Sequence, residues 1–411
     1  MHASATTRRV GSIEITAFFT AFIAVTYAFG IYFFPALIPE MRRDLGFDQE
    51  FVGLTTGLSQ GGLMIASLLA SVLVPVIGPM RVMLIAVAVN AAGLLAMAVI
   101  ANPIFMVPVM AAFGGCAGAA WIAVVAIAPD VLPARHQGKL LGLMSSGTAY
   151  GVFLNGLILP PLVSGSGWRS AWAVVGALST VLLIAAAWRL APLWGHSTRR
   201  TAAAGVLQPP SRHLRGLLQP TAILVIAILF VSGLVLSPFQ TYLSSLLREG
   251  FGWRMETASR CWSAIGIGGM FGGFLLGAAA DRISAKWAMV VAYGLLILAA
   301  LSVFLAASIW PVYLGTLLFG AAFNAIFGLI AAYIAKRFPP GIAVPLQGAT
   351  MVALGCGSML GNYLGGLMAD RSGRYEGIYI AVLCGVIVLL ACALVAPRED
   401  RARAAVEATP G

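Results

Sequence analysis

About a dozen apolar stretches, each long enough to cross a lipid bilayer, occupy most of this 411-residue chain. A helix needs roughly 20 apolar residues to span the hydrocarbon core of a membrane. Hydrophobic residues make up 60% of the sequence and charged residues only 9%, which excludes a soluble globular protein. We therefore expect twelve membrane-spanning helices, over residues 13–38, 51–75, 82–101, 104–128, 139–163, 170–190, 219–245, 257–280, 287–308, 311–335, 346–369 and 377–397.

The charges between these stretches alternate in a way that predicts the orientation of the chain. If the N-terminus is cytoplasmic, the inside segments hold 17 of the 25 Lys and Arg residues and 6 of the 14 acidic ones, while the outside segments hold 8 of each. The positive-inside rule then places both termini in the cytoplasm, in a membrane of the bacterial inner-membrane type. Since this asymmetry explains the net charge of +11, the expected partners are the lipid bilayer and a small molecule, and not nucleic acid.

The sequence has none of the common catalytic or metal-binding patterns. Its five cysteines lie inside predicted spans without CxxC or Cys/His spacing, and its four histidines lie in tails or loops. No HExxH or P-loop lysine motif occurs, and no histidine stands near the Ser146-Gly147 pair as a general base. We expect a protein that is not an enzyme and that uses neither a metal nor a cofactor.

The second half of the chain repeats the first. Six spans per half let both halves insert with the same orientation, which is the parallel repeat of many transporters. The predicted organisation is a tail over 1–12, a six-helix bundle over 13–195, a basic linker over 196–218, a second bundle over 219–397 and a tail over 398–411. The matched residues are Gln137-Gly138 with Gln347-Gly348, Gly147 with Gly357, Gly151 with Gly361 and Gly156 with Gly366 at a shift of 210, and Phe113-Gly114 with Phe319-Gly320 at 206.

One loop carries a motif that resembles the major facilitator superfamily of secondary transporters. After the eighth span the chain reads Gly277-Ala-Ala-Ala-Asp281-Arg282 followed by Lys286, while the corresponding loop of the first half keeps Gly78 and Arg81. The resemblance implies an all-α membrane protein with two pseudo-symmetric six-helix bundles and alternating access. It also implies a monomer, and a charge latch formed by Asp281, Arg282, Lys286 and Arg81 that holds one gate closed.

The fifth span is similar to the monocarboxylate-transporter-like and oxalate/formate-like branches of that superfamily. Gly138 stands at its start, Gly147 and Gly151 lie within it, and Gly167-Trp168-Arg169 follows it. Those branches place a lysine in the first span and an Asp/Arg pair in the eighth. Here the first span has Gly30-Ile31, and the eighth has an uncharged stretch over 267–273. A strongly basic anion site is therefore not expected.

Polar and aromatic side chains remain at mid-depth of the spans, where a substrate would bind. Aromatic walls with a polar group suit flat organic ligands, and amides supply neutral hydrogen bonds. An amide at this depth can also serve only to bond one helix to another, and for Asn324 and Asn362 that alternative is the stronger one. The predicted substrate-binding residues are Tyr27, Trp121, Tyr150, Asn155, Gln240, Asn324, Asn362 and Tyr363.

The function predicted from these features is secondary or facilitative transport of a small organic metabolite, more readily inward than outward. Because the core lacks charge, the metabolite is expected to be neutral or weakly charged, with an aromatic or heterocyclic ring. One alternative is a proton-coupled carrier of monocarboxylate-type anions, in which Glu14 and Asp130 are the candidate coupling residues. An efflux permease is a second alternative, and a receptor or membrane-embedded enzyme without transport is a third.

Overall fold

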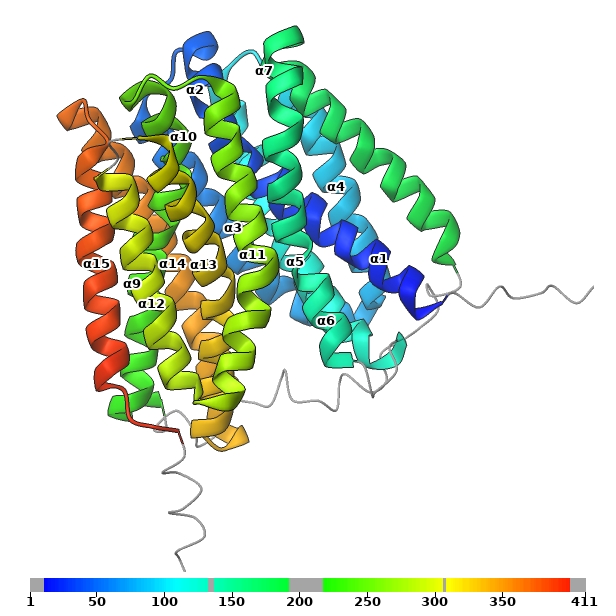
Figure 1. Cartoon of the computed structure of the whole chain (residues 1–411). Helices are drawn as coiled ribbons and strands as arrows, with labels where there is room; N and C mark the ends of the chain where they lie inside the picture. The colour runs from blue at the N-terminus through cyan, green and yellow to red at the C-terminus, as the bar shows by residue number, and fades with distance from the viewer. Residues whose placement is uncertain (1–10, 132–136, 192–216, 306–307, 400–411) are drawn as a thin grey trace, which may run out of the picture.

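The computed structural model describes residues 11–131, 137–191, 217–305 and 308–399, which are almost entirely helical and contain no β-strand (Figure 1). Helices suit the apolar spans because each satisfies its own backbone hydrogen bonds in lipid. The first half contains α1 (Ser12–Ile23), η1 (Ala24–Ile31), α2 (Phe33–Leu45), α3 (Gln49–Ile77), α4 (Pro79–Val99), η2 (Pro103–Phe105), α5 (Met106–Val131), α6 (Gln137–Ser145) and α7 (Gly147–Arg189). The second half contains α9 (Pro220–Thr241), α10 (Leu243–Ser245), η6 (Leu246–Gly250), α11 (Met255–Arg282), α12 (Ala285–Phe304), α13 (Ile309–Arg337), α14 (Pro340–Ser372) and α15 (Glu376–Val395).

Eleven of the described helical segments are long and apolar enough to span a membrane, and one of them makes two crossings. The chain reverses inside α7 at Gly167, whose φ of 80° and ψ of 174° favour glycine. Pro160 and Pro161 lie in the same helix and do not end it. The twelve expected spans are therefore present, and the boundary between the fifth and sixth falls in the expected gap between residues 163 and 170.

Helix crossings inside the two halves confirm the internal repeat. At each crossing a glycine faces a backbone carbonyl, and a Cβ atom in its place would lie about 2 Å from the oxygen, or 3.1 Å in the case of Gly151. The crossings recur at the shifts found in the sequence. The equivalent pairs are Gly62–Ala111 with Gly268–Leu317 at 206, Gly114–Ser59 with Gly320–Ile265 at 206, Gly147–Thr20 with Gly357–Phe230 at 210, and Gly151–Ala24 with Gly361–Leu234 at 210.

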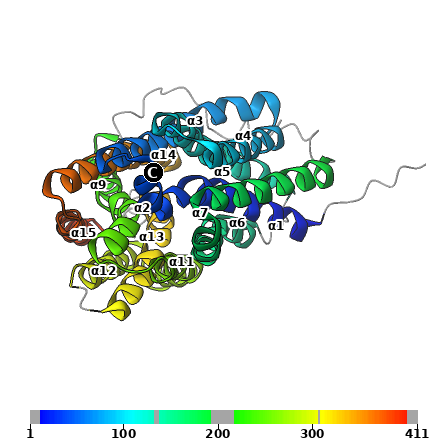
Figure 2. The ribbon, with the colours of Figure 1, turned by 90° about the horizontal axis from the view of Figure 1, so that it is seen from above.

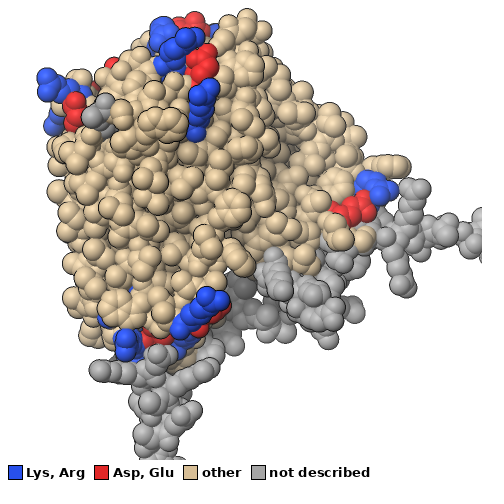
Figure 3. Space-filling view, viewed as in Figure 1, with Lys and Arg blue, Asp and Glu red and all other residues tan. Residues whose placement is uncertain are grey.

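The two halves lie beside each other, and long helices from each form the boundary between them. Viewed from above, α3 lies against α14 and α7 lies against α11 (Figure 2). On the face of the molecule seen in Figure 3, charged side chains gather toward the ends, and a broad uncharged belt lies between them. That belt is what a hydrocarbon layer of about 30 Å requires.

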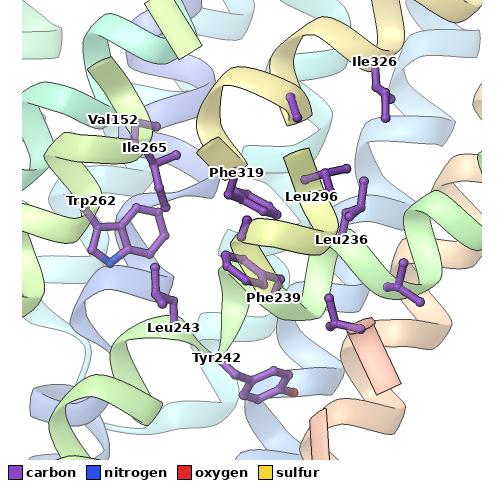
Figure 4. Packing of buried hydrophobic residues seen from close by; sticks show 14 of the residues in the cluster. Val152, Leu236, Phe239, Tyr242, Leu243, Trp262, Ile265, Leu296, Phe319 and Ile326 are labelled. Carbon is purple, nitrogen blue, oxygen red and sulfur yellow. The ribbon is translucent and has the colours of Figure 1, made fainter. Parts of the chain in front are cut away.

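Aromatic packing fixes the core of the second half (Figure 4). Phe239 of α9 stacks on Phe319 of α13 with ring centroids 4.1 Å apart, and Tyr379 of α15 packs edge-on against Phe239 at 5.3 Å. These contacts join three helices that are distant in the sequence. Helix α9 ends in a break, after which α10 and η6 follow. The aromatic contacts therefore hold this end of α9 in place.

The expected domain boundaries stay a prediction, because most of the linker over 196–218 lies outside the described residues. The described helices end at Arg189 and resume at Pro220, close to the expected limits. Residues 398 and 399, expected to begin the C-terminal tail, pack instead against the second half. The Glu399 carboxylate is buried and accepts a hydrogen bond from the backbone N–H of Ala285 at the start of α12, 2.5 Å away.

Candidate substrate cavity and gate

A cavity of about 2340 Å³ lies between the two halves. Its wall is formed mainly by η1, α3, α5, α6 and α7 of the first half and by α9, α11, α13 and α14 of the second. The lining continues to Asp281 and Gly341, which stand at helix ends on one face of the molecule. On the opposite face the halves are in contact. The cavity therefore opens toward one side of the membrane, and we call the contacts that close the other side the gate.

Backbone contacts form the inner layer of the gate. A Cβ atom on Gly53 of α3 would lie 2.4 Å from the carbonyl oxygen of Asn362 in α14. A Cβ atom on Gly366 of α14 would lie 2.1 Å from the carbonyl oxygen of Gln49 in α3. Gly156 of α7 makes the equivalent approach to α11. Only glycine, which has no side chain, lets these backbones come so close. The closed gate therefore depends on glycine at these three positions.

Two ion pairs form the outer layer of the gate and join the halves. Arg248 in η6 donates to the Glu40 carboxylate of α2 at 2.7 Å, and both side chains are largely buried. Arg42 of α2 donates to the Glu249 carboxylate of η6, also at 2.7 Å. Each half thus supplies one acid and one base, just after its first span. Sequence reasoning treated these charges as parts of loops outside the membrane and missed them.

Asp370 near the end of α14 bonds directly to the start of α3. Its two carboxylate oxygens accept the backbone N–H groups of Gln49 and Glu50, at 3.1 and 2.5 Å. The first N–H groups of a helix have no partner within the helix, and the helix dipole favours a negative charge there. Asp370 therefore joins the second half of the molecule to the start of α3 in the first half.

Two tyrosines complete the gate. The Tyr363 hydroxyl donates to the Glu50 carboxylate at 2.9 Å, and the Tyr375 hydroxyl donates to Glu249. Burial, and next the hydrogen bond to Glu249, raises the pKa of the Tyr375 phenol above its usual range. A phenol is protonated at neutral pH in any case, and the raised pKa keeps this one a donor at more alkaline pH than usual. Tyr363, predicted to bind substrate, lies in the gate and outside the cavity lining.

A π-helical turn in the first span shapes part of the cavity wall contributed by the first half. In η1 the backbone N–H of Tyr32 bonds to the carbonyl of Tyr27, five residues earlier. Residues five apart stand one above the other in a π-helix, so both tyrosines face the cavity. Two buried amides hold this turn: Asn90 of α4 donates to the Val25 carbonyl at 3.1 Å, and a second amide from α7 donates to the Ala28 carbonyl.

The second amide belongs to Asn155, which was predicted to bind substrate. Its Nδ2 atom lies 2.9 Å from the Ala28 oxygen, and its side chain is fully buried away from the cavity. The structure therefore gives Asn155 a role in positioning the wall, because an α-helix would have satisfied the same carbonyl without it.

Replacing this amide tests the role. Asn155→Leu is expected to lower the free energy of unfolding by about 1 kcal/mol, because the Ala28 carbonyl loses its donor. The melting temperature of the purified protein in detergent measures the change. Ser179→Ala is the matched control, since Ser179 is equally buried in α7 but bonds only within its own helix. Equal melting temperatures for the two variants would contradict the assignment.

The other six predicted substrate-binding residues line the cavity. The aromatic ones come from three helices of the first half, and the amides come from three helices of the second. Among the described lining residues Asp281 is the single charged side chain, so the expected uncharged core is present. The six residues are Tyr27, Trp121, Tyr150, Gln240, Asn324 and Asn362. Their contact with a substrate stays a prediction.

The predicted charge latch lies on the open face and closes nothing in this conformation. Asp281, Arg282 and Arg81 are exposed and make no ion pair with any described residue. Lys286 donates to the Leu394 carbonyl at 2.8 Å within its own half. Their role in the opposite conformation stays a prediction.

The two candidate coupling residues are placed unequally. Glu14 of α1 pairs with Arg189 of α7 at 2.7 Å, near the open face and outside the cavity lining. Asp130 lies in the last turn of α5, and its side chain lies outside what the structure describes. The Glu14 carboxylate is therefore not on the described cavity wall, and the role of Asp130 stays a prediction.

Comparisons with known proteins agree with this architecture. The family model of the Major Facilitator Superfamily matches residues 20–352. A gallate transporter of Pseudomonas putida is 27% identical over 288 residues, which cover 63% of this chain and 64% of that protein. Among solved structures, a nucleoside transporter matches 93% of this chain and 99% of its own with a TM-score of 0.76 at 13% identity. A D-xylose–proton symporter matches 94% and 98% with a TM-score of 0.73 at 16% identity.

At such low identities the two structures support the fold alone, whereas the family model covers most of the sequence. Together with twelve helical crossings in two repeated halves and a central cavity, that match settles the class of protein. The chain belongs to the Major Facilitator Superfamily and is a multi-pass membrane transporter, not an enzyme.

Proposed function

We propose that this transporter carries small hydroxylated aromatic acids across the bacterial inner membrane, in the direction of uptake. The observation that supports the proposal is the composition of the cavity wall. Tyr27, Tyr32, Trp121 and Tyr150 offer aromatic faces with polar groups, and no Lys or Arg is among the described lining residues. Such a wall favours a planar ring over a small inorganic ion.

The similarity to a gallate transporter supports the same class of substrate. Gallate is a benzoate with three ring hydroxyls, so it combines the expected aromatic ring with the carboxylate of the alternative prediction. The matched region spans about two thirds of that relative, and the substrate is carried over here as a proposal.

The orientation follows from the charges on the two faces. The face that carries the described ends of the chain has the basic surplus, so we assign it to the cytoplasm. The cavity in this structure then opens to the cytoplasm, and the gate closes the periplasmic side. Uptake requires the gate to open to the outside, and the halves to rock around the cavity.

Uptake into proteoliposomes tests the proposal. Radiolabelled gallate is expected to enter protein-containing vesicles, and unlabelled gallate and 3,4-dihydroxybenzoate should inhibit its entry. Acetate, xylose and uridine should not inhibit, and protein-free vesicles give the background. Thermal stabilisation by each compound gives an independent measure of binding. Inhibition by uridine or xylose, with no effect of the aromatic acids, would contradict the proposal.

A proton-coupled mechanism is the second candidate, and the uncharged wall favours it. When both ends of the cavity close around it during the cycle, an aromatic carboxylate leaves bulk water with no cation beside it, unless a proton accompanies it. Acidifying the outside of the vesicles should then accelerate uptake. The variants Glu14→Gln and Asp130→Asn should abolish that acceleration if these residues carry the proton. If uptake does not depend on the external pH, proton coupling is excluded and facilitated diffusion becomes the favoured mechanism.

A further inference from the structure

The closed end of the cavity holds polar side chains with unused hydrogen-bonding capacity. Ser59 of α3 is 1% exposed, and its hydroxyl has no partner among the described residues. Gln240 of α9 is 4% exposed, lines the cavity, and makes no hydrogen bond with a described residue. Asn362 of α14 is 1% exposed and accepts from the Thr241 hydroxyl at 3.1 Å, which leaves its NH₂ group unused. We call Ser59, Gln240 and Asn362 the cavity floor.

These three residues line the cavity just inside the gate. Asn362 lies at the level of Gly53, whose Cβ atom would approach the Asn362 carbonyl oxygen, and Gln240 precedes Thr241, which bonds to Asn362. Ser59 comes six residues after Gly53 in α3 and so stands about 9 Å further from the gate end of that helix. The hydrogen bond between Thr241 and Asn362 and the crossing of α3 with α14 bring the three helices together there.

The floor is polar and carries no charge. Asp281, the single charged side chain of the described lining, stands at the open end of the cavity. Leaving a buried polar group without a partner is unfavourable, so a ligand that supplies the missing partners is favoured. An ionised group would find no counter-charge at this depth. A hydroxyl suits the floor better, because it can both donate to and accept from Ser and amide side chains.

The internal repeat shows that the Gln240 amide has no counterpart in the first half. At the shift of 210, Gln240 corresponds to Gly30 in the π-helical turn of the first span. A side chain at Gly30 would collide with Asn90, since a Cβ atom there lies 2.7 Å from the Asn90 amide oxygen. The first half therefore contributes tyrosine rings and the Ser59 hydroxyl, while the second contributes the floor amides. A ligand held there can pack its ring on the tyrosines and bond its polar groups to the floor.

We propose that the cavity floor binds the ring hydroxyls of the substrate and that the carboxylate points toward the open end. This inference rests on the proposed function and specifies its substrate as an aromatic acid with hydroxyls remote from the carboxylate. The tyrosines of η1 contact the ring. The carboxylate stays in the wider, water-accessible part of the cavity, so no basic residue is needed to hold it.

The test compares gallate with benzoate, which lacks the ring hydroxyls, by calorimetric titration of the purified protein. Gln240→Leu is expected to weaken gallate binding about tenfold and to leave benzoate binding unchanged. Ser59→Ala should weaken gallate in the same selective way, and it removes a single oxygen atom, so it is the safer variant for folding. Gln60→Leu is the matched control. Gln60 also lines the cavity but is partly exposed, and its change should stay below twofold.

Three results would overturn the proposal. Equal losses of gallate and benzoate binding in Gln240→Leu would mean that the floor has a structural role only. A loss in Gln60→Leu as large as that in Gln240→Leu would mean that the effect is not specific to the floor. Equal affinities of the unaltered protein for gallate and benzoate would refute the role of the floor, while leaving the proposed aromatic substrate intact. Failure to bind either acid would refute the proposed function itself.

Discussion

Gly53→Ala should hold the gate open and reduce transport by about tenfold to a hundredfold. The added Cβ atom would lie 2.4 Å from the carbonyl oxygen of Asn362 and 2.9 Å from the Cα atom of Tyr363. Both neighbours are backbone atoms, so neither can move aside without shifting α14. Overpacking of this kind costs about 1–3 kcal/mol, and each 1.4 kcal/mol is a factor of ten in the equilibrium.

Chemical labelling measures the gate directly and needs no substrate. Ser245→Cys places a thiol at a fully buried position beside the gate, in a background without the five native cysteines. A membrane-impermeant maleimide should label it faster in Gly53→Ala than in the parent. Gly273→Ala is the control, because a Cβ atom at that cavity-lining glycine meets nothing within 4 Å. Unchanged labelling and uptake in Gly53→Ala would show that the two backbones need not come so close.

Arg248→Met should open the same gate by removing a charge. The Glu40 side chain, which is 9% exposed, would lose its ion-pair partner. Its Oε2 atom already has no hydrogen-bond partner among the described residues. Breaking a buried ion pair costs about 3–5 kcal/mol, which corresponds to at least a hundredfold shift toward the open state. Adding Glu40→Gln should recover part of the loss, because the unpaired charge is then removed.

The control for this variant is an exposed arginine of the same face. Arg254→Met removes a partner of Glu256, but the Arg254 side chain is 85% exposed, and such pairs contribute less than about 1 kcal/mol. Labelling of Ser245→Cys should rise strongly with Arg248→Met and little with Arg254→Met. Equal effects of both would mean that the net charge of the face governs the gate, and not the pair.

The sequence allowed the framework of the molecule to be predicted. Apolar stretches of membrane length are a strong local signal, so the twelve crossings were found, including the reversal at Gly167. The repeat was also visible, because the crossings inside each half require glycine at fixed positions. Six of the eight predicted substrate-binding residues lie on the cavity wall, since neutral polar groups are rarely placed at mid-membrane depth without reason.

The remaining features depend on partners far away in the chain. The amides that hold the π-helical turn are 65 and 127 residues from the carbonyls they bind, so Asn155 looked like a candidate ligand. The Glu40–Arg248 pair spans 208 residues, and each charge alone resembles an ordinary loop residue. A comparison of the ends of the first and seventh spans would have revealed their opposite charges. The π-helix leaves no such trace in the sequence.

The gate is closed by ion pairs and charged hydrogen bonds between the two halves, and this has a kinetic consequence. On the gate side the empty carrier must break two ion pairs and the bonds of Asp370 before it can turn outward. In the empty carrier no substrate contacts offset that loss. In the loaded carrier, contacts with the bound substrate can offset part of it and so lower the barrier to the change of conformation. We expect the return of the empty carrier to be the slow limb of the cycle, so that exchange of substrate for substrate across the membrane outpaces net accumulation.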